Sequence, residues 1–111
     1  MSNFQARQGD IFFKVVGSKP TGKAVKPYTS NVLAYGEVTG HAHKMISPAI
    51  EEIEMVTDEQ GDIYVLSKNE DIKVWHDEHN TITLPKNHWI CVSRQREYDP
   101  LAVEKQRRVA D

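Results

Sequence analysis

Histidine and acidic side chains gather in two short segments of this 111-residue chain. The first segment, GEVTGHAH (36–43), ends with His41 and His43, and the second segment, HDEH, spans residues 76–79. Residues two apart on a strand point to the same face, so His41 and His43 are expected to aim at one spot. If the two segments pair or face each other, three or four nitrogen and oxygen ligands converge. Zn²⁺, Fe²⁺, Mn²⁺ and Ni²⁺ all accept such a set, so the spacing predicts a divalent metal site without distinguishing the metal.

Each residue of the two segments has an expected role. We expect His41, His43 and His79 to be the core metal ligands, with His76 or Glu78 as the fourth ligand or as a hydrogen-bonding partner of a ligand. If the metal keeps an open coordination position, Glu78 is also the candidate catalytic residue, acting as general base toward a bound water molecule. The alternative is that the histidines lie on solvated strand faces and bind nothing.

A second candidate site lies in the segment SRQREYDP (93–100). On a strand, Arg94, Arg96 and Tyr98 share one face, and the two arginines there could bind an anion or a carboxylate. The alternative is a network of ion pairs across the sheet with nearby acidic residues. The candidates for that network are Glu51, Glu52 and Glu54. The remaining histidine, His88, stands next to a tryptophan and is expected in a turn or at the surface, outside the metal site.

Short segments of β-type residues must position these groups, and they recur about every ten residues between turn signals. They are 8–16, 31–38, 51–56, 62–67, 72–76, 81–84 and 88–97. This rhythm is typical of an all-β, mostly antiparallel domain, either a small barrel or a sandwich. We expect a single domain over residues 1–111, a flexible N-terminal tail at 1–7, and at most a short helix at the C-terminus.

Two glycines, Gly36 and Gly40, bracket the residues just before the first histidine pair. Glycine inside a strand often marks a bulge or a close backbone approach. We expect at least one of them to adopt a conformation that a Cβ would resist, bending the strand so that His41 and His43 point inward.

The overall composition excludes several classes of protein. The 14 basic and 16 acidic side chains give a net charge of −2, which provides no bulk attraction for nucleic acid or a membrane surface. The single cysteine cannot form an internal disulfide, which is typical of a reducing cytosol. No segment resembles a signal peptide or reaches the roughly 20 apolar residues of a membrane span. We therefore expect a cytoplasmic protein (in the host cytoplasm if a phage encodes it) and a homo-oligomer formed through exposed strands.

Several motifs together resemble a family of small uncharacterised phage and bacterial proteins. The resemblance rests on QGD (8–10), LAYGEVTGHAH (33–43), HDEH (76–79), LPKNHW (84–89) and RQREYDP (94–100). This chain has Asn87 where the family pattern has glycine and Trp89 where it has tyrosine. Asparagine tolerates the left-handed backbone conformation that glycine supplies, so the resemblance implies the same turn at Asn87. It implies no particular activity.

A more distant resemblance is to the cupins, small β-barrels with a His-x-His metal motif. GEVTGHAH is similar to the start of their first motif, and LPKN (84–87) is similar to the Pro-x-Gly turn of their second. This chain departs from cupins because Ser47 and Pro48 stand where the glutamate ligand is expected, and no histidine follows LPKN at the expected distance. A cupin-like site would therefore have to be rebuilt from the HDEH segment.

Three functions are consistent with these patterns. The first is a small metal-binding β-barrel protein with an accessory or regulatory role, whose partner is an unidentified small molecule or protein. The second is a cupin-like metalloenzyme that acts on a small substrate through a metal with an open position. The third is an interaction module that binds no metal.

Overall fold

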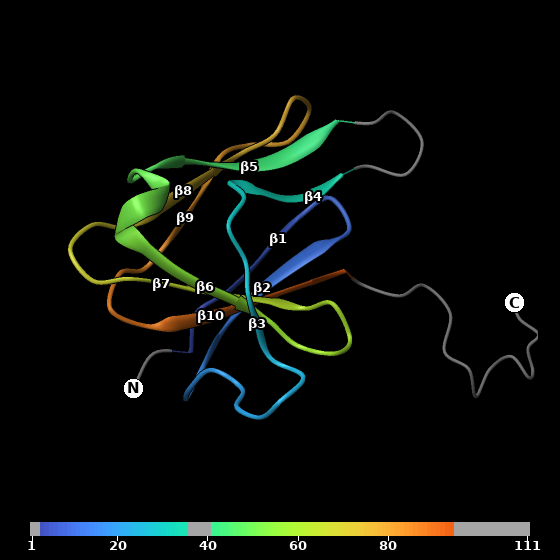
Figure 1. Cartoon of the computed structure of the whole chain (residues 1–111). Coiled ribbons are helices and arrows are strands. Elements are labelled where there is room, and N and C mark those ends of the chain that lie inside the picture. Colours follow the sequence, from blue (N-terminus) through green and yellow to red (C-terminus); the bar gives the residue numbers. More distant parts are fainter. Residues whose placement is uncertain (1–2, 36–40, 95–111) are drawn as a thin grey trace, which may run out of the picture.

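The computed structural model describes residues 3–35 and 41–94, and these residues form two stacked antiparallel β-sheets (Figure 1). The elements in chain order are β1 (Gln5–Gln8), β2 (Ile11–Val16), β3 (Lys26–Pro27), β4 (Val32–Tyr35), β5 (Ala42–Ser47), the 3₁₀ turn η1 (Ile50–Glu52), β6 (Ile53–Thr57), β7 (Ile63–Ser67), β8 (Ile72–Trp75), β9 (Ile82–Leu84) and β10 (Trp89–Arg94). The all-β, antiparallel prediction is confirmed, and the architecture is an open sandwich rather than a closed barrel.

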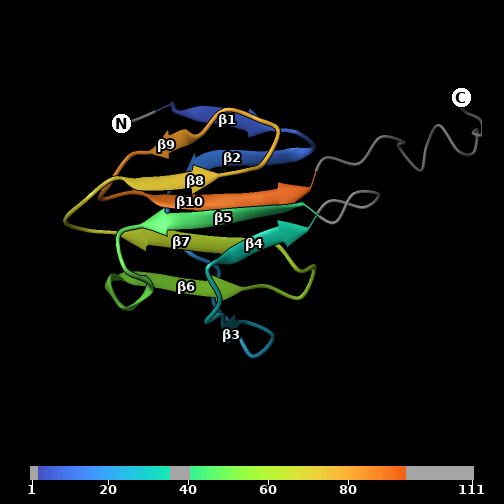
Figure 2. The ribbon, with the colours of Figure 1, turned by 90° about the horizontal axis from the view of Figure 1, so that it is seen from above.

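The larger sheet has the strand order β1-β2-β10-β7-β6-β3, and the smaller sheet has the order β4-β5-β8-β9. Seen from above, the smaller sheet covers the larger one (Figure 2). Figure 2 also places the β1–β2 turn and the β8–β9 loop at the same end of the sandwich. Segments far apart in the sequence therefore meet at that end.

The core lies between the two sheets because both present alternating apolar side chains to each other. On β2, Ile11 and Phe13 are buried, whereas Phe12 and Lys14, which alternate with them, are exposed. On β8, the inward-facing Ile72 and Val74 are completely buried. The period of two fixes which residues of each strand can reach the interior.

Two turns between the strands are stabilised by their backbone chemistry. In the turn at 58–61, the Asp58 carboxylate accepts hydrogen bonds from the backbone N–H groups of Gln60 and Asp62, each at 3.0 Å. Gly61 supplies a φ of 88° there, which a side chain would resist. Asn87 adopts the expected left-handed conformation, with a φ of 65°.

The N-terminal tail expected at residues 1–7 overlaps strand β1, which pairs with β2 from Gln5 opposite Lys14 to Gln8 opposite Ile11. The segment Gln-Ala-Arg-Gln carries almost no apolar alternation, so its sequence does not indicate a strand. Gly36 and Gly40 lie outside the described residues, as does the C-terminal segment with its expected helix. In the part of the chain that the structure describes, no helix is long and apolar enough to cross a membrane.

Candidate functional site: a histidine cluster between the sheets

The register of β5 and β8 brings the two histidine segments together. Lys44 lies opposite Trp75 and Met45 opposite Val74, so one further step places His43 opposite His76. Both side chains point to the inner face, where His43 is 2% and His76 7% exposed. Their ring centroids are 4.3 Å apart.

Two more imidazoles lie around His76. Its ring centroid is 4.7 Å from that of His79 and 5.9 Å from that of His41. Two imidazoles on one tetrahedral zinc ion have centroids roughly 5 Å apart, given a Zn–N bond of about 2 Å. The three centroid separations in this cluster, 4.3, 4.7 and 5.9 Å, lie on both sides of this zinc-site value. The four histidines of the two segments therefore lie together.

Gln8 determines which nitrogen of His43 carries the proton. The Gln8 Nε2 group donates to the carbonyl oxygens of Val74 at 3.0 Å and Asn80 at 2.8 Å, so its amide orientation is fixed. Its Oε1 atom then faces Nδ1 of His43 at 2.8 Å and must accept a hydrogen bond from an N–H there. In the neutral imidazole, Nε2 of His43 consequently carries a lone pair.

The surroundings of His43 also keep the ring neutral. Its pKa is lowered from 6.5 to about 4, chiefly by burial and next by the nearby His76; Asp10 opposes this shift, and His79 and Arg94 add smaller lowering effects. Neutral imidazole is the form that binds metals. His43 is thus a buried, neutral group whose Nε2 is ready to accept a metal ion or a proton.

His76 has the opposite tautomer. The backbone N–H of Glu78 donates to Nδ1 of His76 at 3.0 Å. That nitrogen must therefore hold a lone pair, and the neutral ring carries its proton on Nε2. While this hydrogen bond is present, His76 is a donor through Nε2 and not a metal ligand.

His41 lies between two carboxylates. Its Nε2 atom is 3.4 Å from a carboxylate oxygen of Asp77, and its Nδ1 atom is 3.6 Å from one of Glu78. The His41 side chain is 30% exposed and that of Glu78 is 59% exposed. At 3.6 Å the Glu78 carboxylate lies beside Nδ1 of His41 without a hydrogen bond to it, so the orienting role of Glu78 stays a prediction.

Gly9 provides the space for two of the rings. It has a φ of 62°, and a Cβ built there would be 3.0 Å from Nε2 of His79 and 3.6 Å from Cε1 of His43. Only a residue without a side chain fits this turn in its present form, because the conformation and the space both exclude a Cβ. Gly9 therefore places the β1–β2 turn directly against the histidine cluster.

Three contributors to this site were missed by the sequence analysis: Gln8, Gly9 and Asp77. The first two belong to the QGD segment that carried the family resemblance, and the third lies inside HDEH. Among the described residues, no group of three or more histidine, cysteine, aspartate or glutamate side chains has the arrangement of a formed metal site. His88, in the bend just before β10, takes no part in the ring contacts between these histidines.

The predicted anion site is only partly described. Arg94 binds the Asp10 carboxylate and also donates to the backbone carbonyl of Tyr35 at 2.7 Å. Among the described residues, its carboxylate partner is therefore Asp10 of the β1–β2 turn, whereas the sequence analysis considered three glutamates for an ion-pair network. Arg96 and Tyr98 lie outside the described residues.

A family model described as "Domain of unknown function (DUF8820)" matches residues 7–95. The chain belongs to this family. The match confirms that the chain is a member of an uncharacterised family. The DUF8820 region includes all four clustered histidines together with Gln8, Gly9 and Arg94, and it ends before Arg96 and Tyr98. Comparison with curated proteins and with solved structures gave no match.

Proposed function

We propose that this protein binds a divalent metal ion, such as Zn²⁺, Fe²⁺, Mn²⁺ or Ni²⁺, and serves as an accessory or regulatory metal-binding protein. The ligands in this proposal are His43 and His79, with His41 as the third. The observation that carries it is the hydrogen bond between Gln8 and His43, which leaves Nε2 of a buried, neutral imidazole with its lone pair. Metal-binding histidines characteristically donate their second ring N–H to an oxygen in this way.

The differences in burial among the ligands support the same assignment. His43 is fixed by the core, whereas His79 is exposed and the His41 side chain is 30% exposed. Exposed side chains change rotamer at little cost, so His41 and His79 can adjust around a metal ion that His43 anchors. In this scheme Glu78 orients His41, and His76 donates its Nε2–H to a metal-bound water or anion.

Metal analysis of untagged protein after dialysis against Zn²⁺ or Co²⁺ tests this proposal. The decisive variant is His43→Asn, because the asparagine amide can replace the Nδ1–H that Gln8 accepts but has no equivalent of Nε2. We expect wild-type protein to retain one metal per chain and His43→Asn and His79→Ala to lose it. His88→Asn is the control and should retain it. Stoichiometric metal in both His43→Asn and His79→Ala would overturn the proposal.

His76 allows a further distinction. If it is a donor and not a ligand, His76→Gln should retain the metal with affinity reduced by about tenfold, the effect typical of residues that orient ligands. Loss of the metal from His76→Gln as complete as from His43→Asn would instead make His76 a ligand. A wild-type protein that binds no metal at all would favour the interaction module.

A metalloenzyme is the second candidate, with Glu78 as general base. The observation that favours it is a cavity lined in part by Ala34, the residue directly opposite His43 across β4 and β5. A cytoplasmic location and a homo-oligomeric state stay predictions from the sequence.

A further inference from the structure

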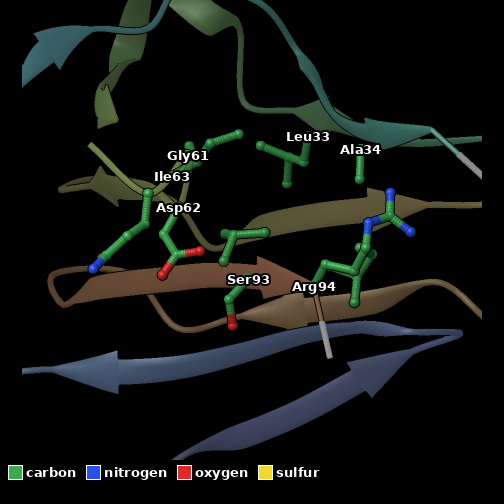
Figure 3. Close-up of a pocket in the computed structure, with 10 residues that line it drawn as sticks. Leu33, Ala34, Gly61, Asp62, Ile63, Ser93 and Arg94 are labelled. Atoms are coloured by element: carbon green, nitrogen blue, oxygen red, sulfur yellow. The ribbon is translucent and has the colours of Figure 1, made fainter. Parts of the chain in front are cut away.

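A cavity of about 300 Å³ lies between the two sheets, and one of its lining residues, Ala34, is directly opposite His43. Figure 3 shows Leu33 and Ala34 pointing into it from β4, with Asp62 on one side and Arg94 on the other. Its apolar lining includes Leu33, Ile63 and Val92. The cavity therefore combines apolar walls with a cation at one side, which is typical of sites for small organic molecules.

The cavity adjoins His43 through the β4–β5 ladder. Ala34 and His43 are directly opposite residues of an antiparallel pair, so their side chains share one face and their Cβ atoms are about 5 Å apart. Arg94 and Asp10 are also close enough to His43 to influence its pKa in opposite directions. A molecule in the cavity would therefore be separated from His43 by its cross-strand neighbour Ala34.

Arg94 already holds a carboxylate, that of Asp10. The side chain of Arg94 is 32% exposed and that of Asp10 is 46% exposed. Ion pairs this exposed contribute little to stability, so a carboxylate of a ligand can replace Asp10 on the guanidinium group. Arginine suits this exchange because its planar fork binds carboxylates through two parallel hydrogen bonds.

We propose that this cavity binds a small monocarboxylic acid, with its carboxylate on Arg94 in place of Asp10 and its apolar body against Leu33, Ile63 and Val92. Asp62 on the opposite side of the cavity disfavours a second carboxylate, which is why the ligand has only one. The position of this ligand beside a metal ion rests on the proposed function, whereas its binding to Arg94 does not.

Calorimetric titration of chelator-treated, metal-free protein with hexanoate tests the inference separately from the proposed function. Hexanamide and adipate are the matched probes, since one lacks the charge and the other adds a second carboxylate. We expect each of them to bind at least tenfold more weakly than hexanoate. Equal binding of hexanoate and hexanamide would show that Arg94 is not the anchor.

Two variants should change the affinity in opposite directions. Arg94→Gln should weaken hexanoate binding at least tenfold, whereas Asp10→Asn should strengthen it about threefold or more, because it removes the competing carboxylate. Arg7→Gln on the outer face of the larger sheet is the control and should stay within twofold of wild type. A gain of affinity cannot result from misfolding, so an Asp10→Asn variant without that gain overturns the proposal even if Arg94→Gln is unstable.

Discussion

Acid should destabilise the metal-free protein through His43. The side chain is 2% exposed, and its pKa is lowered from 6.5 to about 4. In the unfolded chain the imidazole returns to its ordinary pKa near 6.5. Between these two values the unfolded state binds more protons than the folded state, so the free energy of unfolding falls as the pH falls. The contribution is complete above about pH 6.5 and is lost progressively toward pH 4.

The size of this effect follows from the two pKa values. Each pKa unit corresponds to about 1.4 kcal/mol, so lowering the pH from about 7.5 to about 4.5 should remove about 2–3 kcal/mol through this one group. His43→Asn can keep the hydrogen bond to Gln8 but does not titrate. The variant should be less stable than wild type at neutral pH, yet its stability should fall by about 2–3 kcal/mol less over the same pH range.

Urea unfolding in the presence of a chelator, followed by tryptophan fluorescence, measures both quantities. All other titrating groups are shared by the two proteins, so the difference between their pH profiles isolates His43. His88→Asn is the control and should reproduce the wild-type profile. Parallel profiles for wild type and His43→Asn would refute the reasoning, because they would mean that burial does not disfavour the charged form of His43.

Three further substitutions test how the site is built. Gln8→Met should cost about 3 kcal/mol, because it leaves two buried polar groups, the Val74 carbonyl and the His43 N–H, and the partly buried Asn80 carbonyl without their partner. Gln5→Met on the exposed face of the same strand should be nearly neutral by urea unfolding. Gly9→Ala should lower the free energy of unfolding by about 1–2 kcal/mol and weaken metal binding, because the added Cβ displaces the imidazole of His79. Gly22 also has a positive φ but lies in open space, so Gly22→Ala should leave metal binding unchanged in the dialysis assay. Asn87→Gly should preserve or slightly raise the melting temperature, and Asn87→Val should lower it, because a β-branched residue resists a φ of 65°.

The strands were predictable because their signals are local. Alternation of apolar and polar residues indicates a strand without knowledge of its partners, and β7 begins at Ile63, within one residue of the predicted segment 62–67. The turn at Asp58 was predictable for the same reason, since its hydrogen bonds join residues at most four positions apart. The choice of a sandwich over a barrel depends on which edge strands meet, and no local pattern contains that information.

The histidine cluster was only partly predictable. The i, i+2 spacing of His41 and His43 indicates a shared face from sequence alone. The role of Gln8 does not follow from sequence, because its partner His43 is 35 positions away and β1 has no apolar alternation to reveal it as a strand. The tautomers also depend on hydrogen bonds that exist only in the folded chain. The sequence therefore predicts which imidazoles gather, and the fold determines which of their nitrogens can bind.

The β1–β2 turn connects the two proposed binding sites. Three consecutive residues each contact a different residue of the proposed sites. Gln8 hydrogen-bonds to His43, Gly9 packs against His79, and Asp10 forms an ion pair with Arg94. A carboxylate that displaces Asp10 would release one end of this turn, while the other end stays attached to the metal-binding imidazole. Because the three contacts share a short segment of backbone, a shift of Asp10 changes the position of Gly9 against the exposed ligand. For the two proposed sites, the geometry therefore predicts that acid binding at Arg94 and metal binding at the histidines are interdependent, and by linkage each ligand would alter the affinity for the other by the same factor.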